Sequence, residues 1–484
     1  MSKIKKQAVS GILWNAVQML VNQGSAFIIK LVLARILFPE EFGLVGMAAV
    51  FIGLVQVFND LGIGAALIQR KEEDLREAHF QTAFWTGVGW AVLMYLVICF
   101  IVAPFAASFY NEPILESLLP VLGLGILSSP VNLVHKAQLT KKMDFKRIAL
   151  ISNSSNITSG LLSLILAFAG AGVWSLAFNS VASIVIAMPL FFMATGWKPK
   201  FQFEKQAFQE VFGFGIFTTG TNITNYLIGN VDYLLIGKML SAQALGAYTF
   251  AFILTDTFRS RLMAVMNNVL YPLYSKMQDD PASLKKYYLK VVEYNSVVIF
   301  PIMLFFITLA DPIILVVFGD KWAESIDPLK ILSLAVMVHM MVNSNTALLR
   351  GLGRPGLEMK LQLFKAVIFL PLVYVGVRNY GVNGAAGAVL LNKFIAVIIA
   401  QYTFKKLLSV KINTAEFFEA VKFPWLASII AYIVVYVQLN YLNFHYLIAV
   451  VSLFAIYGLL MYVFLGKELK EQWQQMKQLK VIKR

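Results

Sequence analysis

Residues 83–109 read AFWTGVGWAVLMYLVICFIVAPFAASF, a stretch of 27 residues without a charged side chain. A helix needs about 20 consecutive apolar residues to cross a bilayer core roughly 30 Å thick, so this stretch predicts a membrane-spanning helix. Similar blocks recur along the 484-residue chain, of which 59% is apolar and only 14% charged. Soluble proteins carry about 25% charged residues. The composition therefore excludes a soluble enzyme and predicts an all-α polytopic membrane protein with almost no extramembrane domain.

The connections between the apolar blocks carry charge asymmetrically. Every second connection, together with the two termini, holds 31 of the 41 Lys and Arg residues. Cytoplasmic loops are enriched in Lys and Arg, so we expect both termini in the cytoplasm. The net charge of +15 then reflects membrane topology and requires no nucleic-acid partner. Fourteen spans are predicted, at 9–33, 43–68, 83–109, 114–135, 148–169, 173–196, 211–237, 244–274, 288–310, 328–350, 357–377, 383–404, 422–440 and 445–465.

The chain contains an internal repeat with an offset of 203 to 209 residues. Residues 33–43 (LARILFPEEFG) align with 236–246 (IGKMLSAQALG), and 172–177 (GVWSLA) align with 381–386 (GVNGAA). Two copies with an even number of spans insert the same way and are related by an axis along the membrane normal. We therefore predict two six-helix lobes in a pseudo-twofold arrangement plus two extra C-terminal helices. The predicted boundaries are 1–204 for the N-terminal lobe, 205–411 for the C-terminal lobe, 412–466 for the last two spans and 467–484 for a basic cytoplasmic tail.

Polar side chains follow one face of the first span of each repeat. At 100° per residue, Asn22 and Lys30 share an arc with other polar residues of span 1, and Asn222, Asn225 and Asp232 share one on span 7. Such a stripe forms either a hydrogen-bonded seam between helices or the wall of a water-filled cavity. The matched placement in the two repeats favours the cavity.

Other ionisable residues lie inside the predicted spans, where each costs about 2.5–3.5 kcal/mol unless it faces a cavity or a partner. Asp256 and Arg259 lie three residues apart on one helical face; the pair either neutralises itself or opens when a ligand or proton arrives. Lys365 and Lys393, with Lys30 and Arg259, would make a cavity positive enough for a pyrophosphate. Asp60 precedes a glycine-rich stretch and has either a structural or an ion-coupling role.

Several motifs resemble one known family of membrane transporters. The resemblance rests on residues 33–48 (LARILFPEEFGLVGMA), 58–70 (FNDLGIGAALIQR), 172–176 (GVWSL), 237–240 (GKML) and 245–248 (LGAY). These stretches resemble the Wzx-type polysaccharide flippases of the multidrug/oligosaccharidyl-lipid/polysaccharide exporter superfamily, especially the lipopolysaccharide and colanic- or teichuronic-acid exporters.

The resemblance implies a flippase that moves undecaprenyl-diphosphate-linked oligosaccharide from the cytoplasmic to the outer leaflet of the bacterial inner membrane by alternating access. It implies no cofactor, a coupling gradient of H⁺ or Na⁺, and the polysaccharide polymerase and chain-length proteins as partners. Asp232 matches an acidic position of the family and is the leading ion-coupling candidate. Asp256 and Asp60 are the other ion-coupling candidates. The substrate-binding candidates are Lys30, Asn22, Asn222, Asn225, Arg259, Lys365 and Lys393.

Two other functions remain open on the sequence alone. A multidrug antiporter of the same superfamily would need an acidic cavity for cationic drugs, whereas the predicted spans hold more cations than carboxylates. A membrane glycan polymerase or ligase would need a sizeable outer loop with Arg or His. The largest predicted outer connection, residues 311–327, contains one Lys and neither Arg nor His.

Overall fold

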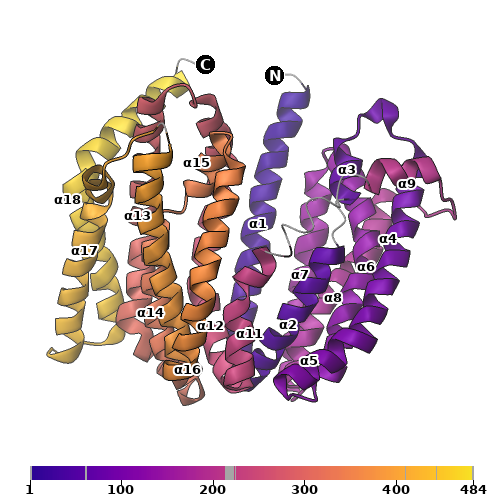
Figure 1. Cartoon of the computed structure of the whole chain (residues 1–484), viewed down its shortest axis with the longest axis horizontal. Helices are drawn as coiled ribbons and strands as arrows, with labels where there is room; N and C mark the ends of the chain where they lie inside the picture. Colours follow the sequence, from indigo (N-terminus) through magenta and orange to yellow (C-terminus); the bar gives the residue numbers. More distant parts are fainter. Residues whose placement is uncertain are drawn as a thin grey trace. The chain divides into compact units, whose positions relative to one another are not determined.

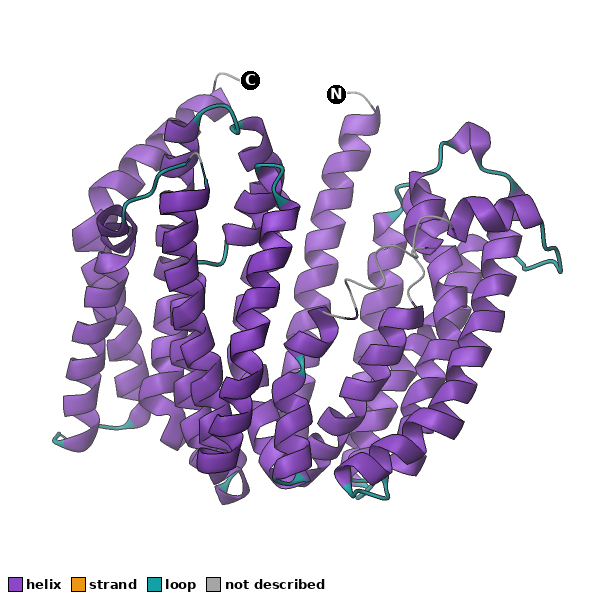
Figure 2. Ribbon diagram, viewed as in Figure 1, coloured by secondary structure: helices purple, strands orange, loops and turns teal. Residues whose placement is uncertain are grey.

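The protein is described here from a computed structural model that covers residues 3–59, 63–212, 223, 225–408, 410–442 and 444–481. Nearly all of these residues are helical, and none of them forms a strand (Figure 2). The prediction of an all-α polytopic protein is therefore confirmed. The chain divides into two compact units, unit 1 (Met1–Gly246) and unit 2 (Ala247–Arg484).

Unit 1 is built from long helices that pack both on helices near in sequence, such as α7 on α8, and on distant ones, such as α7 on α1. A π-helical segment, Ile98–Val102, joins α4 to α5. The helices, labelled in Figure 1, are α1 (Lys3–Ile36), α2 (Pro39–Asn59), α3 (Ile63–Gln69), α4 (Glu77–Val97), α5 (Ala103–Tyr110), α6 (Leu115–Lys141), α7 (Phe145–Phe168), α8 (Val173–Thr195), α9 (Lys205–Phe212), α11 (Val231–Met239) and the start of α12 (Ala242–Lys276).

Unit 2 contains the remainder of α12 and the helices that follow it. A π-helical segment, Ile313–Phe318, and a 3₁₀ segment, Asp320–Ser325, connect α13 to α14. A further π-helical segment, Thr403–Leu407, ends α16. The helices are α13 (Pro281–Pro312), α14 (Ile326–Met340), α15 (Asn345–Gly351), α16 (Pro355–Tyr402), α17 (Thr414–Asn440) and α18 (Tyr446–Val481).

Eleven helical stretches among the described residues are long and apolar enough to span a membrane. One of them, Pro355–Leu407, covers two predicted spans, because α16 bends back on itself at Gly381. Predicted span 8 corresponds to α12, a 35-residue helix that carries Asp256, Arg259 and Arg261. Most of predicted span 7 lies outside the described residues, so the total of fourteen spans stays a prediction.

Side chains on the outer surface suit contact with acyl chains. Phe100 is 75% exposed, and Val367 and Ile398 are each 68% exposed. Helices satisfy their own backbone hydrogen bonds, so an apolar helical surface can face lipid without cost. The two units together provide such surfaces on several helices, as a multi-pass membrane protein requires.

The paired glycines of the repeat adopt the same backbone conformation. Gly172, which precedes α8, has φ 57° and ψ −131°, and Gly381, inside α16, has φ 58° and ψ −137°. A positive φ is strained for residues with a side chain and is readily adopted by glycine. Each glycine reverses the chain between two antiparallel helices, so this match supports the internal repeat predicted from the sequence.

A second pair of repeat-related glycines packs together within unit 1. A Cβ atom added to Gly43 would lie 1.7 Å from the carbonyl oxygen of Ala242, and one added to Gly246 would lie 1.7 Å from that of Pro39. Pro39 and Ala242 are related by the same 203-residue offset as Gly43 and Gly246. The contact is therefore reciprocal: each copy places its glycine against the backbone of the other, as expected near a pseudo-twofold axis.

The predicted lobe boundary after residue 204 stays a prediction, because it follows the sequence repeat, whereas the two compact units are defined by packing contacts. Helix α11 lies beyond that boundary and packs on α2 and α5 of unit 1. The contact-based division at Gly246 reflects this packing, whereas the predicted boundary follows the sequence repeat. The predicted tail, in turn, continues α18 as a helix up to Val481.

The connection between α8 and α9 is fixed to the start of α4. The backbone N–H of Lys200 donates to Gln81 Oε1 at 2.6 Å, and the Nη2 of Arg76 donates to Glu204 Oε1 at 2.6 Å. Glu210 on α9 receives hydrogen bonds from buried His79 and from Arg70, and these bonds lower the pKa of the Glu210 carboxyl to about 2. This predicted cytoplasmic segment is thus held by several polar contacts.

Candidate substrate-binding site in unit 2

One membrane helix of unit 2 is interrupted in its middle. Helix α14 ends at Met340 and α15 begins at Asn345, with a turn over residues 341–344. In the turn, the N–H of Val342 bonds to the carbonyl of His339 at 3.1 Å, and that of Asn345 to the carbonyl of Val342 at 3.1 Å. These bonds span three residues instead of four. Non-helical backbone at membrane depth is tolerated where it is buried in protein or lines a cavity, and broken helices mark many transporter binding sites.

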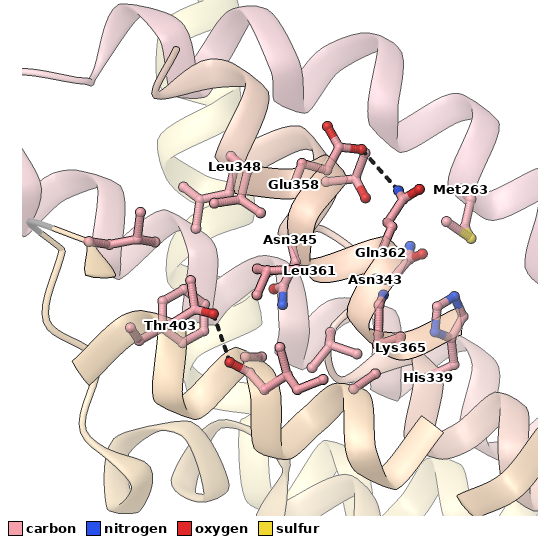
Figure 3. A pocket seen from close by; sticks show the side chains of 18 residues that line it. Met263, His339, Asn343, Asn345, Leu348, Glu358, Leu361, Gln362, Lys365 and Thr403 are labelled. Carbon is pink, nitrogen blue, oxygen red and sulfur yellow. Dashed lines mark hydrogen bonds between the residues drawn. The ribbon is translucent and has the colours of Figure 1, made fainter. Parts of the chain in front are cut away.

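A cavity of about 260 Å³ adjoins this interruption. Its wall combines apolar side chains, such as Leu348 and Leu361, with polar ones from three segments of unit 2 (Figure 3). The polar lining residues are His339, Asn343, Asn345, Thr346, Glu358, Gln362, Lys365 and Thr403.

One wall of the cavity is a polar face of α16. Glu358, Gln362 and Lys365 lie four and three residues apart, which places them on the same face of the helix, and Figure 3 shows Gln362 between the other two. The buried Glu358 carboxylate accepts two hydrogen bonds from Arg350, of 2.7 and 3.0 Å, and one from the Gln362 amide at 3.2 Å. The bidentate Arg350 contact compensates the buried charge of Glu358.

The part of the wall formed by the end of α14 and the turn contains buried polar atoms that have no hydrogen-bond partner in the described part of the chain. Asn343 is 4% exposed, and its Oδ1 has no hydrogen-bond partner in the described part of the chain; the same holds for Nδ1 of His339. The Oδ1 of Asn345 accepts a hydrogen bond from the hydroxyl of Tyr288. An unpaired buried polar group costs about 1–3 kcal/mol, so Asn343 and His339 favour a site that a polar ligand completes.

Three predicted cations lie around the same histidine. Lys393, Arg259 and Lys365 are all close enough to His339 to act electrostatically on its ring. Lys365 lines the cavity itself, and Nη1 of Arg259 lies 2.9 Å from the sulfur of Met263, another lining residue. The predicted Asp256–Arg259 pair is present, with Arg259 Nε donating to Asp256 Oδ1 at 2.8 Å. The structure thus brings together four of the predicted site residues.

The other predicted residues belong to unit 1. Lys30 is exposed on α1 and Asn22 is half-buried there. Asn225 is exposed, whereas Asp232 is 5% exposed in the first turn of α11, where its carboxylate accepts a hydrogen bond from the N–H of Tyr233 at 3.0 Å. Asn222 and Asp60 lie outside the described residues.

The predicted span over residues 211–237 is interrupted in its last third, which lies within the described residues. Helix α11 begins at Val231, and Asn230 before it has φ −125° and ψ 12°, which are not helical values. The interruption breaks the 100° spacing on which the shared arc of Asn225 and Asp232 depends. These two residues therefore do not form a single helical stripe.

Unit 1 has a pocket of its own, of about 570 Å³, between α2, α3, α6 and α8. Asn132 on α6 donates to the carbonyl of Ile184 at 2.9 Å, and Asn132 Oδ1 has no partner among the described residues. The polar residues of this pocket are Gln56, Asn59, Ser129, Asn132, Lys136 and Thr140.

Sequence reasoning missed most of the unit 2 cavity. The spacing of Glu358, Gln362 and Lys365 is a signal that a search for polar helical faces would have found, but only Lys365 was singled out. His339 carries no such signal, because it is a lone polar residue in an apolar block, whereas Asn343 begins a run of four polar residues, 343–346. Among the described residues, no group of three or more His, Cys, Asp or Glu side chains is arranged to hold a metal ion.

Comparison with known proteins decides the family. A family model described as polysaccharide biosynthesis protein matches residues 32–327. The chain belongs to this polysaccharide biosynthesis protein family. The resemblance to Wzx-type exporters is confirmed by two relatives of nearly full length. The lipopolysaccharide biosynthesis protein WzxC of Escherichia coli (strain K12) is 25% identical over 409 residues, covering 83% of this chain and 82% of WzxC.

The teichuronic acid biosynthesis protein TuaB of Bacillus subtilis (strain 168) is 24% identical over 438 residues, covering 88% of each chain. Among solved structures, the lipid II flippase MurJ in an inward closed conformation matches with a TM-score of 0.73 at 15% identity, covering 95% of this chain and all of MurJ. The chain is therefore a multi-pass membrane protein of polysaccharide biosynthesis with the MurJ fold, and it is not an enzyme.

Proposed function

We propose that the protein flips an undecaprenyl-diphosphate-linked oligosaccharide repeat unit from the cytoplasmic to the outer leaflet of the bacterial inner membrane. The observation that carries the proposal is the polar cavity at the broken helix α14–α15, with Arg259, Lys365 and Lys393 nearby. Burying a polar head group in lipid costs several kcal/mol or more. A polar site with cations beside it inside a membrane bundle lowers that cost for an anionic sugar head group, while the polyprenyl tail stays in lipid.

The remaining parts of the proposal follow the predictions from the sequence. Both termini lie in the cytoplasm, the units rock between inward and outward states, and a gradient of H⁺ or Na⁺ drives transport through Asp232, Asp256 and Asp60. The polysaccharide polymerase and chain-length proteins are the proposed partners. A multidrug antiporter is the weaker alternative, because cations gathered around His339 would repel a cationic drug.

A leaflet-resolved assay tests this function. Proteoliposomes would contain the purified protein and a fluorescent undecaprenyl-diphosphate oligosaccharide, with a membrane-impermeant quencher reporting the outer leaflet and with H⁺ or Na⁺ gradients imposed in turn. We expect gradient-dependent flipping that falls at least tenfold in Lys393→Met and stays normal in Lys360→Met, an exposed lysine on the same helix that is not one of the three cations acting on His339. Equal flipping in empty liposomes would refute the function.

A further inference from the structure

We propose that the unit 2 cavity is a subsite for a single pyranose ring of the cargo, and that the diphosphate binds elsewhere. This inference rests on the proposed function and assigns one part of the substrate to one site. It reinterprets Lys365, which the sequence alone grouped with the diphosphate-binding cations.

The charge of the cavity argues against a diphosphate. The charged side chains among its described lining residues are one carboxylate, Glu358, and one ammonium, Lys365. Glu358 is already paired with Arg350, and its carboxylate oxygens would repel any phosphate oxygen placed near them. Lys365 is therefore the single cation among the described lining residues that could face a diphosphate. Arg259 and Lys393 are not among the lining residues, so the surplus positive charge lies outside the cavity.

The hydrogen-bonding groups of the cavity suit sugar hydroxyls. An amide or a carboxylate can form two hydrogen bonds to a pair of vicinal hydroxyls. A side-chain amide both donates and accepts hydrogen bonds, and so does a sugar hydroxyl. Asn343, Gln362 and Glu358 supply such groups from two walls, and the Oδ1 of Asn343 has no partner within the described chain. Leu348 and Leu361 between them offer an apolar surface for the C–H face of a ring.

The size of the cavity limits its occupant. Pockets for drug-sized ligands measure about 300–1,000 Å³, and this cavity measures about 260 Å³. It therefore has room for one sugar ring and not for a whole repeat unit. A subsite for one ring would make the protein select its cargo by a single sugar.

Binding of free sugars tests the inference without transport. Saturation-transfer NMR on the full-length protein in detergent would use the methyl glycosides of glucose, galactose, N-acetylglucosamine and glucuronic acid, and ³¹P line broadening would follow inorganic pyrophosphate. We expect transfer to at least one glycoside, at least fivefold weaker in Gln362→Met and unchanged in Gln243→Met, a glutamine exposed on α12.

A second variant tests whether the Glu358 carboxylate keeps a diphosphate out of the cavity. Glu358→Gln has the same shape and removes the one carboxylate among the described lining residues. It also releases Arg350, whose side chain is 57% exposed to solvent. We expect pyrophosphate broadening to appear in this variant and to be absent from the wild type. Wild-type broadening that is lost in Gln362→Met, or no transfer to any glycoside, overturns the subsite. Normal flipping together with absent sugar contact rejects the subsite alone, whereas sugar contact without flipping rejects the transport function alone.

Discussion

The pockets of unit 1 and unit 2 occupy corresponding places in the repeat and differ in charge. With the offsets of 203 and 209 residues, Gln56 and Ile184 of the first pocket correspond to Arg259 and Lys393 beside the second cavity. The first pocket runs along the uninterrupted helix α6, whereas the second adjoins the break between α14 and α15. Both cations and the broken helix therefore belong to one copy.

This difference separates what the duplication supplies from what one copy adds. The turn glycines and the reciprocal glycine contact are shared, so they belong to the framework of both repeats. Three cations, Arg259, Lys365 and Lys393, and an interrupted helix occur in unit 2 near the same histidine, whereas Lys136 is the one cation among the described lining residues of the unit 1 pocket. We infer that the framework sets the geometry of the bundle and that unit 2 carries the recognition of the charged cargo.

Substitutions at the reciprocal glycine contact should disrupt the framework that the two repeats share, and we expect them to have the largest effect on stability. Gly43→Ala and Gly246→Ala each push a methyl group into a backbone carbonyl at 1.7 Å, and backbone cannot move aside as a flexible side chain can. Overpacking costs about 1–3 kcal/mol and sometimes more. Thermal unfolding in detergent should show a clear loss of stability in both variants. Gly24→Ala is the control, because no atom lies within 4 Å of the added methyl group; equal stability in all three would contradict the contact.

The charge difference between the positions of Gln56 and Arg259 can be removed by placing the glutamine of unit 1 at the corresponding position of unit 2. Arg259→Gln copies Gln56 into the second repeat, and we expect flipping to fall at least tenfold, equivalent to about 1.4 kcal/mol. The reverse change, Gln56→Arg, should not increase flipping, since its surroundings lack the broken helix.

A double variant separates recognition from simple loss of the ion pair. Arg259→Gln alone leaves the partly buried Asp256 without its partner, which could impair folding by itself. Asp256→Asn combined with Arg259→Gln is neutral, so it restores folding if only the pair matters. Because Asp256 is also a proposed coupling residue, flipping is measured without an ion gradient, and we expect this equilibration to remain low in the double variant. Recovery of flipping would assign Arg259 a structural role and remove the proposed asymmetry.

The smallest expected effect concerns the α8–α9 connection of unit 1. The folded-state pKa of Glu210, about 2, lies below its ordinary value of 4.5. Its contacts with His79 and Arg70 therefore stabilise the fold fully above pH 4.5, and this contribution is lost as the pH falls from 4.5 towards 2. Glu210→Gln should lower the melting temperature slightly at pH 7 and less at pH 3.5. A pH-independent difference, or the same change in exposed Glu73→Gln, would argue against the ion pairs.

The framework could be predicted because bilayer thickness and glycine conformation leave direct marks in the sequence. Apolar blocks of bilayer length gave the approximate positions of α6, α7 and α8, and the paired Gly172 and Gly381 marked two chain reversals. The offset between the copies was visible in the same segments. These features depend on local physics, which a single sequence records.

The binding cavity could be predicted only in part, because it depends on tertiary contacts. Residues 341–344, Met-Val-Asn-Ser, contain neither proline nor glycine, and the N-cap preference of Asn and Ser is a weak signal for a break inside an apolar block. His339 and Asn343 become meaningful only when α16 brings Gln362 and Lys365 opposite them. The same limit explains why Asn230 was placed inside a continuous span.

The reciprocal contact of Gly43 and Gly246 has a consequence for how the two halves can diverge. A side chain introduced on either member meets main chain of the other repeat, so no compensating side-chain change exists on the opposite face. Residues that line a pocket are not bound in this way, and each can be exchanged singly. In a protein with two fused repeats, the pocket residues of one repeat can therefore change to bind a new substrate, while the glycine contact between the repeats stays the same.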